Sequence, residues 1–309
     1  MLAIGLIFVL SVRAYAVPAS EVVATIAPLH SLVQGVMGDT GEARLLVTGN
    51  ASPHDFQLKP SQMALLHQAR FVFYIGGNLE AFLTRTLESL PGNVRKVAMT
   101  DQQGITVFEV REGGEWEHHD HSAHDHQKED VHHHHEHGEP VDPHIWLDPV
   151  NAVAMVKAIT RELSDAFPEK RSIYKTNALS MISKIEESDE KVKSMLTPVK
   201  DTPFIVFHDA YQYFEKRYGL TAVGSIVLDP GEAASVQRIA VLRQKVQDAG
   251  AVCIFREPQF SDKLSLVVAE GTPVKLGVID PVGGNLKPGS SLYPQLLRGV
   301  AEGLVSCLE

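Results

Sequence analysis

Histidine is the residue type in this chain with the clearest potential for chemistry, because 15 of the 309 residues are histidine. Ten of them lie within residues 116–140, interleaved with aspartate and glutamate and with almost nothing apolar. A segment of this composition cannot build a core, so we expect a disordered loop that captures Zn²⁺ weakly at several sites. The alternative is a loop that only keeps the protein soluble or buffers metal, and that passes no Zn²⁺ to another site. The candidate ligands of this auxiliary site are His118, His119, His121, His124, His126, His132, His133, His134, His135 and His137.

Five histidines remain outside this segment, and three of them stand beside predicted strand or helix ends. His54 follows a predicted strand, His144 precedes a predicted helix, and His208 ends the strand-like run FIVFH. Asp280 holds the equivalent place at the end of VKLGVID. Three neutral imidazoles and one carboxylate satisfy tetrahedral Zn²⁺, so these four residues are candidate metal ligands. Because no local spacing links them, ordinary loop histidines are the alternative.

The other candidate residues have simpler predicted roles. His30 begins a predicted helix, so we expect it to cap that helix or line a cleft, and His67 should be an exposed surface residue. Glu80 and Glu257 follow predicted strands and could accept hydrogen bonds from ligand histidines. Ordinary charges near a helix end are the alternative for both.

The elements that must position these side chains alternate between strand-like and helical stretches, which indicates α/β architecture with mostly parallel sheets. Strand character marks residues 21–29, 43–49, 70–77 and 94–99, with helices predicted at 31–38, 61–68 and 80–90. A second set of strand-like runs lies at 204–210, 220–227, 251–258 and 273–280. The chain therefore predicts two lobes of similar build.

A long helix is predicted between the two sets of strands. Residues 168–197 contain no internal proline or glycine and repeat apolar residues at helical spacing. If helical throughout, this segment would measure about 45 Å at 1.5 Å per residue. We predict a first lobe at residues 17–167, a stiff linking helix at 168–197 and a second lobe at 198–309.

The first 16 residues predict export. The apolar run MLAIGLIFVL is followed by Ala14-Tyr15-Ala16, the small-x-small pattern that signal peptidase accepts. No cysteine stands directly after the expected cleavage point, as a lipid anchor would require, and no other segment is apolar enough to span a membrane. The net charge of −10 gives no sign of the positively charged surface that binds nucleic acid. We expect a monomer in the periplasm, without a lipid or membrane anchor.

The two cysteines, Cys253 and Cys307, both lie in the last quarter of the chain. In an exported protein a disulfide between them is plausible, and two buried free thiols are the alternative.

Several separate motifs, in order, carry a family resemblance. The segments SPHDFQLKPSQ, GGNLEAFL, DPHIWLDP, FIVFHDAYQYFEKRYGL, CIFREPQF and VIDPVGGN accompany the histidine-rich insert. Together they resemble the zinc-specific solute-binding proteins of ABC transporters, the ZnuA type, over nearly the whole mature chain.

The resemblance implies two α/β lobes joined by one long rigid helix, with Zn²⁺ held between them and passed to a membrane permease. The family's ligand histidines fall on His54, His144 and His208, its carboxylate falls on Asp280, and its paired cysteines fall on Cys253 and Cys307. Some zinc-binding members carry a glutamate just before the first histidine, where this chain has Pro53. The fourth ligand is therefore Asp280 or water.

Two other functions fit part of this pattern. Related manganese-binding members place a carboxylate where this chain has His208, and a third imidazole favours Zn²⁺ over Mn²⁺. A manganese or iron carrier or an adhesin-like protein is nevertheless the first alternative. The second is a zinc hydrolase, against which the chain shows neither an HExxH helix nor a nucleophile elbow. We therefore expect a binding protein rather than an enzyme.

Overall fold

The computed structural model describes residues 21–111, 141–228, 230 and 236–309. The predicted signal peptide, its cleavage point and the whole histidine-rich segment at 116–140 lie outside these residues.

The first lobe is built on a four-stranded parallel sheet in the order β2-β1-β3-β4. Parallel strands are covered on both faces, which explains why Val22 and its neighbours in β1 are all buried. The strands are β1 (Val22–Ala24), β2 (Arg44–Leu45), β3 (Phe71–Tyr74) and β4 (Arg95–Ala98).

The second lobe repeats this plan with the order β6-β5-β7-β8, again all parallel. Its central strand β5 is buried along its whole length. The strands are β5 (Phe204–His208), β6 (Ala222–Val227), β7 (Cys253–Arg256) and β8 (Lys275–Val278).

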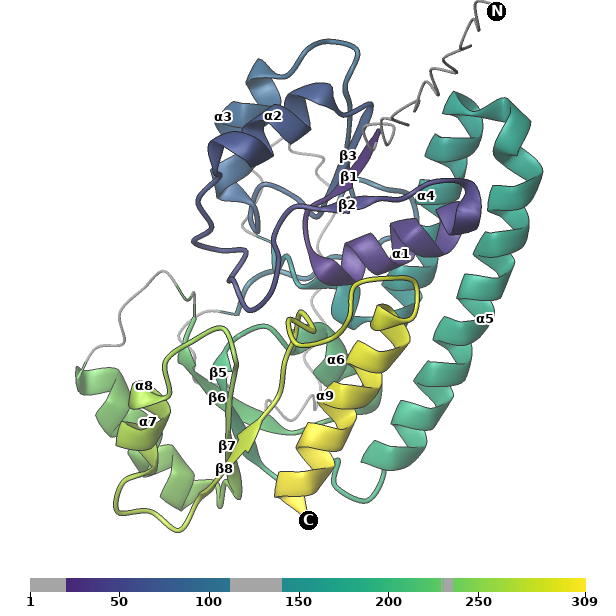
Figure 1. Cartoon of the computed structure of the whole chain (residues 1–309). Helices are drawn as coiled ribbons and strands as arrows, with labels where there is room; N and C mark the ends of the chain where they lie inside the picture. The colour runs from purple at the N-terminus through teal and green to yellow at the C-terminus, as the bar shows by residue number, and fades with distance from the viewer. Residues whose placement is uncertain (1–20, 112–140, 229, 231–235) are drawn as a thin grey trace, which may run out of the picture.

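Helices flank both sheets (Figure 1). The α-helices are α1 (Ala27–Met37), α2 (Pro60–Gln68), α3 (Thr84–Ser89), α4 (Pro149–Ala166), α5 (Arg171–Leu196), α6 (Gln212–Tyr218), α7 (Val236–Asp248), α8 (Lys263–Ala269) and α9 (Leu292–Leu308). Short 3₁₀ turns are η1 (Gly38–Thr40), η2 (Ala81–Leu83), η3 (Ile145–Leu147) and η4 (Pro168–Lys170).

Helix α5 runs along both lobes and packs against α1, α4 and α9 (Figure 1). Its 26 residues correspond to about 39 Å at 1.5 Å per residue. A single cluster of buried apolar side chains extends from Val22 in β1 to Leu308 in α9, and it includes Ile185 of α5. Because the two lobes share this core, moving one against the other would disrupt close packing.

The expected fold class is confirmed, with two differences in its elements. All eight predicted strands are present, but α1 begins at Ala27, four residues earlier than expected. Pro28 lies in the first helical turn, where a missing N–H costs nothing. The long helix was predicted to begin at residue 168. Residues Pro168–Lys170 form the 3₁₀ turn η4 instead, and α5 begins at Arg171.

The disulfide between Cys253 and Cys307 is present, as expected. It joins the start of β7 to the last turn of α9, and both residues are buried. The C-terminal helix is therefore covalently attached to the second sheet.

Candidate metal centre

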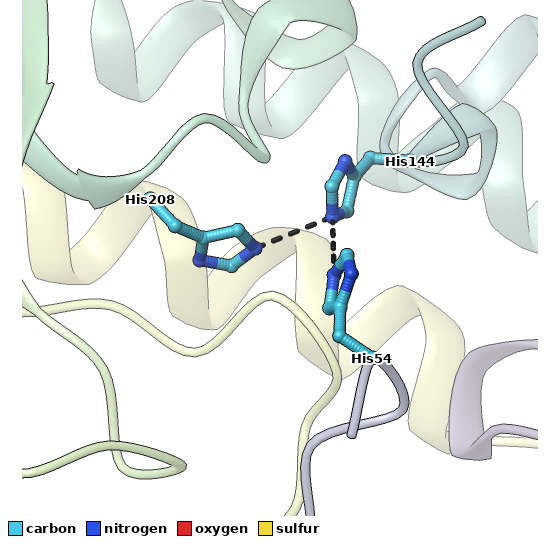
Figure 2. A group of neighbouring side chains, drawn as sticks. All are labelled: His54, His144 and His208. Carbon is cyan, nitrogen blue, oxygen red and sulfur yellow. Dashed lines mark hydrogen bonds between the residues drawn. The ribbon is translucent and has the colours of Figure 1, made fainter. Parts of the chain in front are cut away.

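Three imidazoles meet between the lobes (Figure 2). The Nε2 atom of His144 lies 3.2 Å from Nε2 of His54 and 3.3 Å from Nε2 of His208. One ring nitrogen from each residue falls within 4.8 Å of the others. The structure thus brings together three residues separated by 90 and 64 positions along the chain.

Each histidine comes from a different element. His208 is the last residue of β5, at the carboxyl edge of the second sheet. His144 immediately precedes η3, which leads into α4, and His54 lies in the loop between β2 and α2. His144 and His208 are buried, whereas His54 is half-buried.

Buried carboxylates orient two of the rings. Nδ1 of His144 donates to Oδ1 of Asp142 over 2.8 Å, and Nδ1 of His208 donates to Oε1 of Glu257 over 2.8 Å. A proton held on Nδ1 leaves the lone pair of a neutral ring on Nε2. Both Nε2 lone pairs therefore point into the space between the three rings.

Two of the three separations between ring nitrogens match a tetrahedral ion. Zinc binds imidazole nitrogen at about 2.0–2.1 Å, so two ligand nitrogens of a tetrahedral site stand about 3.3 Å apart. The separations of 3.2 and 3.3 Å lie close to this value. Lone pairs at such distances repel one another without a proton or a cation between them, so the arrangement is suited to holding a metal ion.

The pKa values at this centre are shifted by burial and by neighbouring charges. Burial lowers the pKa of His208, but the carboxylates of Glu257, Asp209 and Asp142 together outweigh this effect and the net shift is upward. Burial also raises the pKa of the Asp142 carboxyl to about 7, against the opposing hydrogen bond from the backbone N–H of His144.

Asp280 does not join the three imidazoles in the described structure. Its Oδ1 accepts hydrogen bonds from Nε2 of Gln259 at 2.8 Å and from the backbone N–H groups of Val282 and Gly283. Its Oδ2 accepts from the backbone N–H of Gly284 at 2.8 Å. Both oxygens are thus engaged with the turn that follows β8.

The remaining predictions for single residues had mixed outcomes. Glu257 supports a histidine, as one reading proposed, and His67 is exposed in α2. The prediction that His30 caps a helix was wrong: it lies inside α1, is buried, and its Nε2 bonds to the carbonyl of Ala43. Glu80 stands at the N-terminal end of η2, as the alternative reading expected, but it is buried and accepts hydrogen bonds from the Thr25 hydroxyl and the backbone N–H groups of Ile75 and Gly76.

Asp142 was not among the residues predicted from the sequence. It stands two residues before His144, in the motif DPH, and its Oδ1 also accepts the backbone N–H of His144. The signal was present, because a carboxylate two residues ahead can bind both the backbone and the ring of the same histidine.

An ion-pair cluster joins the lobes beside the centre. The guanidinium of Arg111 binds both Asp209, the residue after His208, and Glu215 in α6, the latter over 2.7 Å. The hydroxyl of Tyr213 in α6 donates to the carbonyl of Asp142 over 2.8 Å. These contacts fix the segment that carries His144 against the second lobe.

The space enclosed at the centre is small. The cavity among the three rings has a volume of ≈ 10 Å³, and its other walls come from Ser52, Pro53, Trp146, Glu257, Gln259, Phe260, Pro281 and Val282. A single water molecule needs a volume of about this size. The cavity therefore fits an ion rather than an organic ligand.

Two α/β lobes that share a helical backbone and enclose three imidazoles define a metal-binding receptor. Residues 22–307 match the family described as zinc-uptake complex component A, periplasmic (ZnuA). The chain belongs to this family of solute-binding proteins.

Characterised relatives support the assignment. The high-affinity zinc uptake system protein ZnuA of Brucella abortus is 41% identical over 305 residues, which cover 93% of this chain and 91% of that protein. The protein of the same name from Yersinia pestis is 32% identical, covering 94% of this chain and 92% of its own. A crystal structure of ZnuA superposes with a TM-score of 0.76 at 25% identity, over 93% of this chain and 98% of that one.

Proposed function

We propose that this chain is the high-affinity zinc-binding component of an ABC transporter, which captures Zn²⁺ between its lobes and delivers it to a membrane permease. His54, His144 and His208 are the protein ligands. The observation that carries this proposal is the spacing of their Nε2 atoms, 3.2 and 3.3 Å, which suits a tetrahedral ion.

The fourth ligand is water. Asp280 already accepts four hydrogen bonds from its own turn and from Gln259, and a bond to an ion would compete with them for the carboxylate lone pairs. A site of three imidazoles and one water favours Zn²⁺ over Mn²⁺, because Mn²⁺ prefers carboxylate oxygens.

The ion is taken up without an organic chelator, and it is transported rather than used for catalysis. Both statements rest on the same feature, since a cavity of ≈ 10 Å³ among the rings leaves no room for a chelate or for a hydrolase substrate. The family to which the chain belongs consists of solute-binding proteins.

The protein is exported to the periplasm through the signal peptide at residues 1–16 and carries no lipid anchor there. Among the described residues, no helix combines the length and the apolar character needed to cross a membrane. Residues 17–167, 168–197 and 198–309 form the two lobes and their link, and the shared core predicts only modest rearrangement between them.

The histidine-rich segment at 116–140 raises the local concentration of zinc. Arg111 and Val141, which stand on either side of the undescribed residues, both line a cavity of ≈ 440 Å³ that also reaches His54 and His144. Many weak imidazole sites on one tether act at high effective concentration.

Metal competition tests the proposal. A variant lacking residues 116–140 should bind one Zn²⁺ tightly and retain it against excess Mn²⁺, as followed by calorimetric titration. Each of His54→Ala, His144→Ala and His208→Ala should weaken binding strongly in that background. Preference for Mn²⁺, or unchanged zinc affinity in all three variants, would refute the assignment.

A further inference from the structure

Two loops from opposite lobes meet beside the metal centre. The first-lobe loop at residues 49–54 ends at His54, and the second-lobe turn at residues 280–285 follows β8. The side-chain amide of Asn50 donates to Oδ1 of Asn285 over 3.2 Å. The two segments are 235 positions apart in the chain, so this contact exists only when the lobes are together.

Gly284 lets the backbones of these segments approach closely. A Cβ atom at this position would lie 2.7 Å from the carbonyl oxygen of Gly49, and closer still to Oδ1 of Asn50. Since Gly284 is not in the left-handed region of the backbone, the approach itself, not its conformation, requires glycine. Any larger side chain would push the 49–54 loop away.

The 280–285 turn is rigid enough to act as a support. The Asp280 carboxylate accepts the backbone N–H groups of Val282, Gly283 and Gly284. The indole N–H of buried Trp146 donates to the carbonyl of Pro281 over 2.7 Å. The turn is therefore held both internally and by the segment that carries His144.

The supported loop also carries His54. Ser52 and Pro53 of this loop line one wall of the cavity among the rings, and Pro281 and Val282 of the turn line another. The backbone N–H of His54 bonds to the hydroxyl of Ser52 over 3.2 Å, which connects the ring's position to that wall. A displacement of the loop would thus move the His54 imidazole relative to His144 and His208.

We propose that Asp280, Gly284 and Asn50 are positioning residues, which hold His54 at the distance where all three imidazoles share one ion. This inference rests on the proposed function. Asp280 acts here through the turn that it organises and not as a metal ligand. The half-buried histidine is thereby fixed by the opposite lobe, whereas His144 and His208 are held by Asp142 and Glu257.

The variant Gly284→Ala tests this role in the full chain. It should weaken zinc binding at least about tenfold, the lower range for lost support of a metal ligand, in competition with a chromophoric chelator. Gly299→Ala is the matched control, because its added methyl meets nothing within 4 Å on the exposed face of α9. Asn285→Ala removes the amide contact without added bulk and should act in the same direction.

A double-mutant cycle separates positioning of His54 from general damage. In a His54→Ala background, Gly284→Ala should change zinc affinity less than about twofold, since the residue that it positions is gone. The visible spectrum of bound Co²⁺ in Gly284→Ala should shift toward that of His54→Ala. Additive effects in the cycle, or unchanged affinity in both Gly284→Ala and Asn285→Ala, would overturn the inference while leaving the ligand assignment intact. Unchanged affinity in all three of His54→Ala, His144→Ala and His208→Ala would instead refute the proposed function.

Discussion

Nδ1 of His208 donates to Oε1 of Glu257 over 2.8 Å, and both side chains are buried. This contact decides which nitrogen of His208 faces the centre, because the proton on Nδ1 leaves the Nε2 lone pair free for a metal. The same relationship links His144 with Asp142, so two carboxylates bonded to Nδ1 determine which nitrogen of each ring faces the centre.

Removing the Glu257 carboxylate should weaken zinc binding. We expect Glu257→Ala to reduce zinc affinity by about 10- to 100-fold, because His208 loses the acceptor that orients its ring. Calorimetric titration measures the change. Glu187→Ala, at an exposed position on α5, is the control and should bind zinc like the parent chain. Parent-like affinity in Glu257→Ala would show that this hydrogen bond does not tune the site.

Zinc affinity should fall in acid. A proton on the Nε2 atom of a ligand histidine competes directly with the metal, so binding is complete above the histidine pKa and is lost as pH falls through it. Because the net effect of its surroundings raises the pKa of His208, competition should begin above the ordinary value of 6.5. Titrations from pH 8 to pH 5 should show a steep loss of affinity, and a flat profile would argue against imidazole ligands.

Replacing the disulfide should lower stability without changing the metal site. The bridge closes a loop across 54 positions, and the chain-entropy relation gives about 4 kcal/mol for a loop of this length. The double variant Cys253→Ala and Cys307→Ala should therefore unfold at lower denaturant concentration, as measured by circular dichroism. Its zinc affinity at low temperature should equal that of the parent, because both cysteines lie away from the three histidines. A large loss of zinc affinity in the folded variant would contradict this.

Glu80 should contribute to stability in a pH-dependent way. Glu80→Ala leaves the buried N–H groups of Ile75 and Gly76 without their acceptor, at a cost of about 1–3 kcal/mol. Burial raises the pKa of Glu80 from 4.5 to about 7, so the native state binds its proton more tightly than the unfolded chain. Between these two values the contribution of Glu80 decreases as pH rises. Denaturant titrations of both proteins at pH 5 and pH 8 should show a smaller difference at pH 8, and an equal or larger difference would be evidence against this view.

The eight strands and the parallel character of their sheets could be predicted, because strand-like runs such as FIVFH before Asp209 alternate with helical stretches. Helix starts were harder. Residues 27–29 continue an apolar run, so the sequence suggests a longer β1, although Pro28 also suits the first turn of a helix. The prediction for His30 was wrong for this reason. The residue was expected at a helix terminus, but it lies inside the helix and its ring bonds to the carbonyl of Ala43.

The three histidines could be selected as candidates from their positions at strand and helix ends. Their meeting at one point depends on contacts between distant segments. The spacing in the sequence does not show this, and the expectation came from the resemblance to a family. The resemblance also named Asp280, and its hydrogen bonds to the N–H groups of its own turn depend on backbone geometry that the sequence does not display.

X-ray absorption at the zinc edge tests the central claim most directly. The variant lacking residues 116–140, loaded with one equivalent of Zn²⁺, should show three imidazole nitrogens at about 2.0–2.1 Å and one further light ligand. The multiple-scattering signal of the imidazole rings should decrease by one third in His54→Ala. A spectrum with two or fewer imidazoles in the unsubstituted centre would contradict the account.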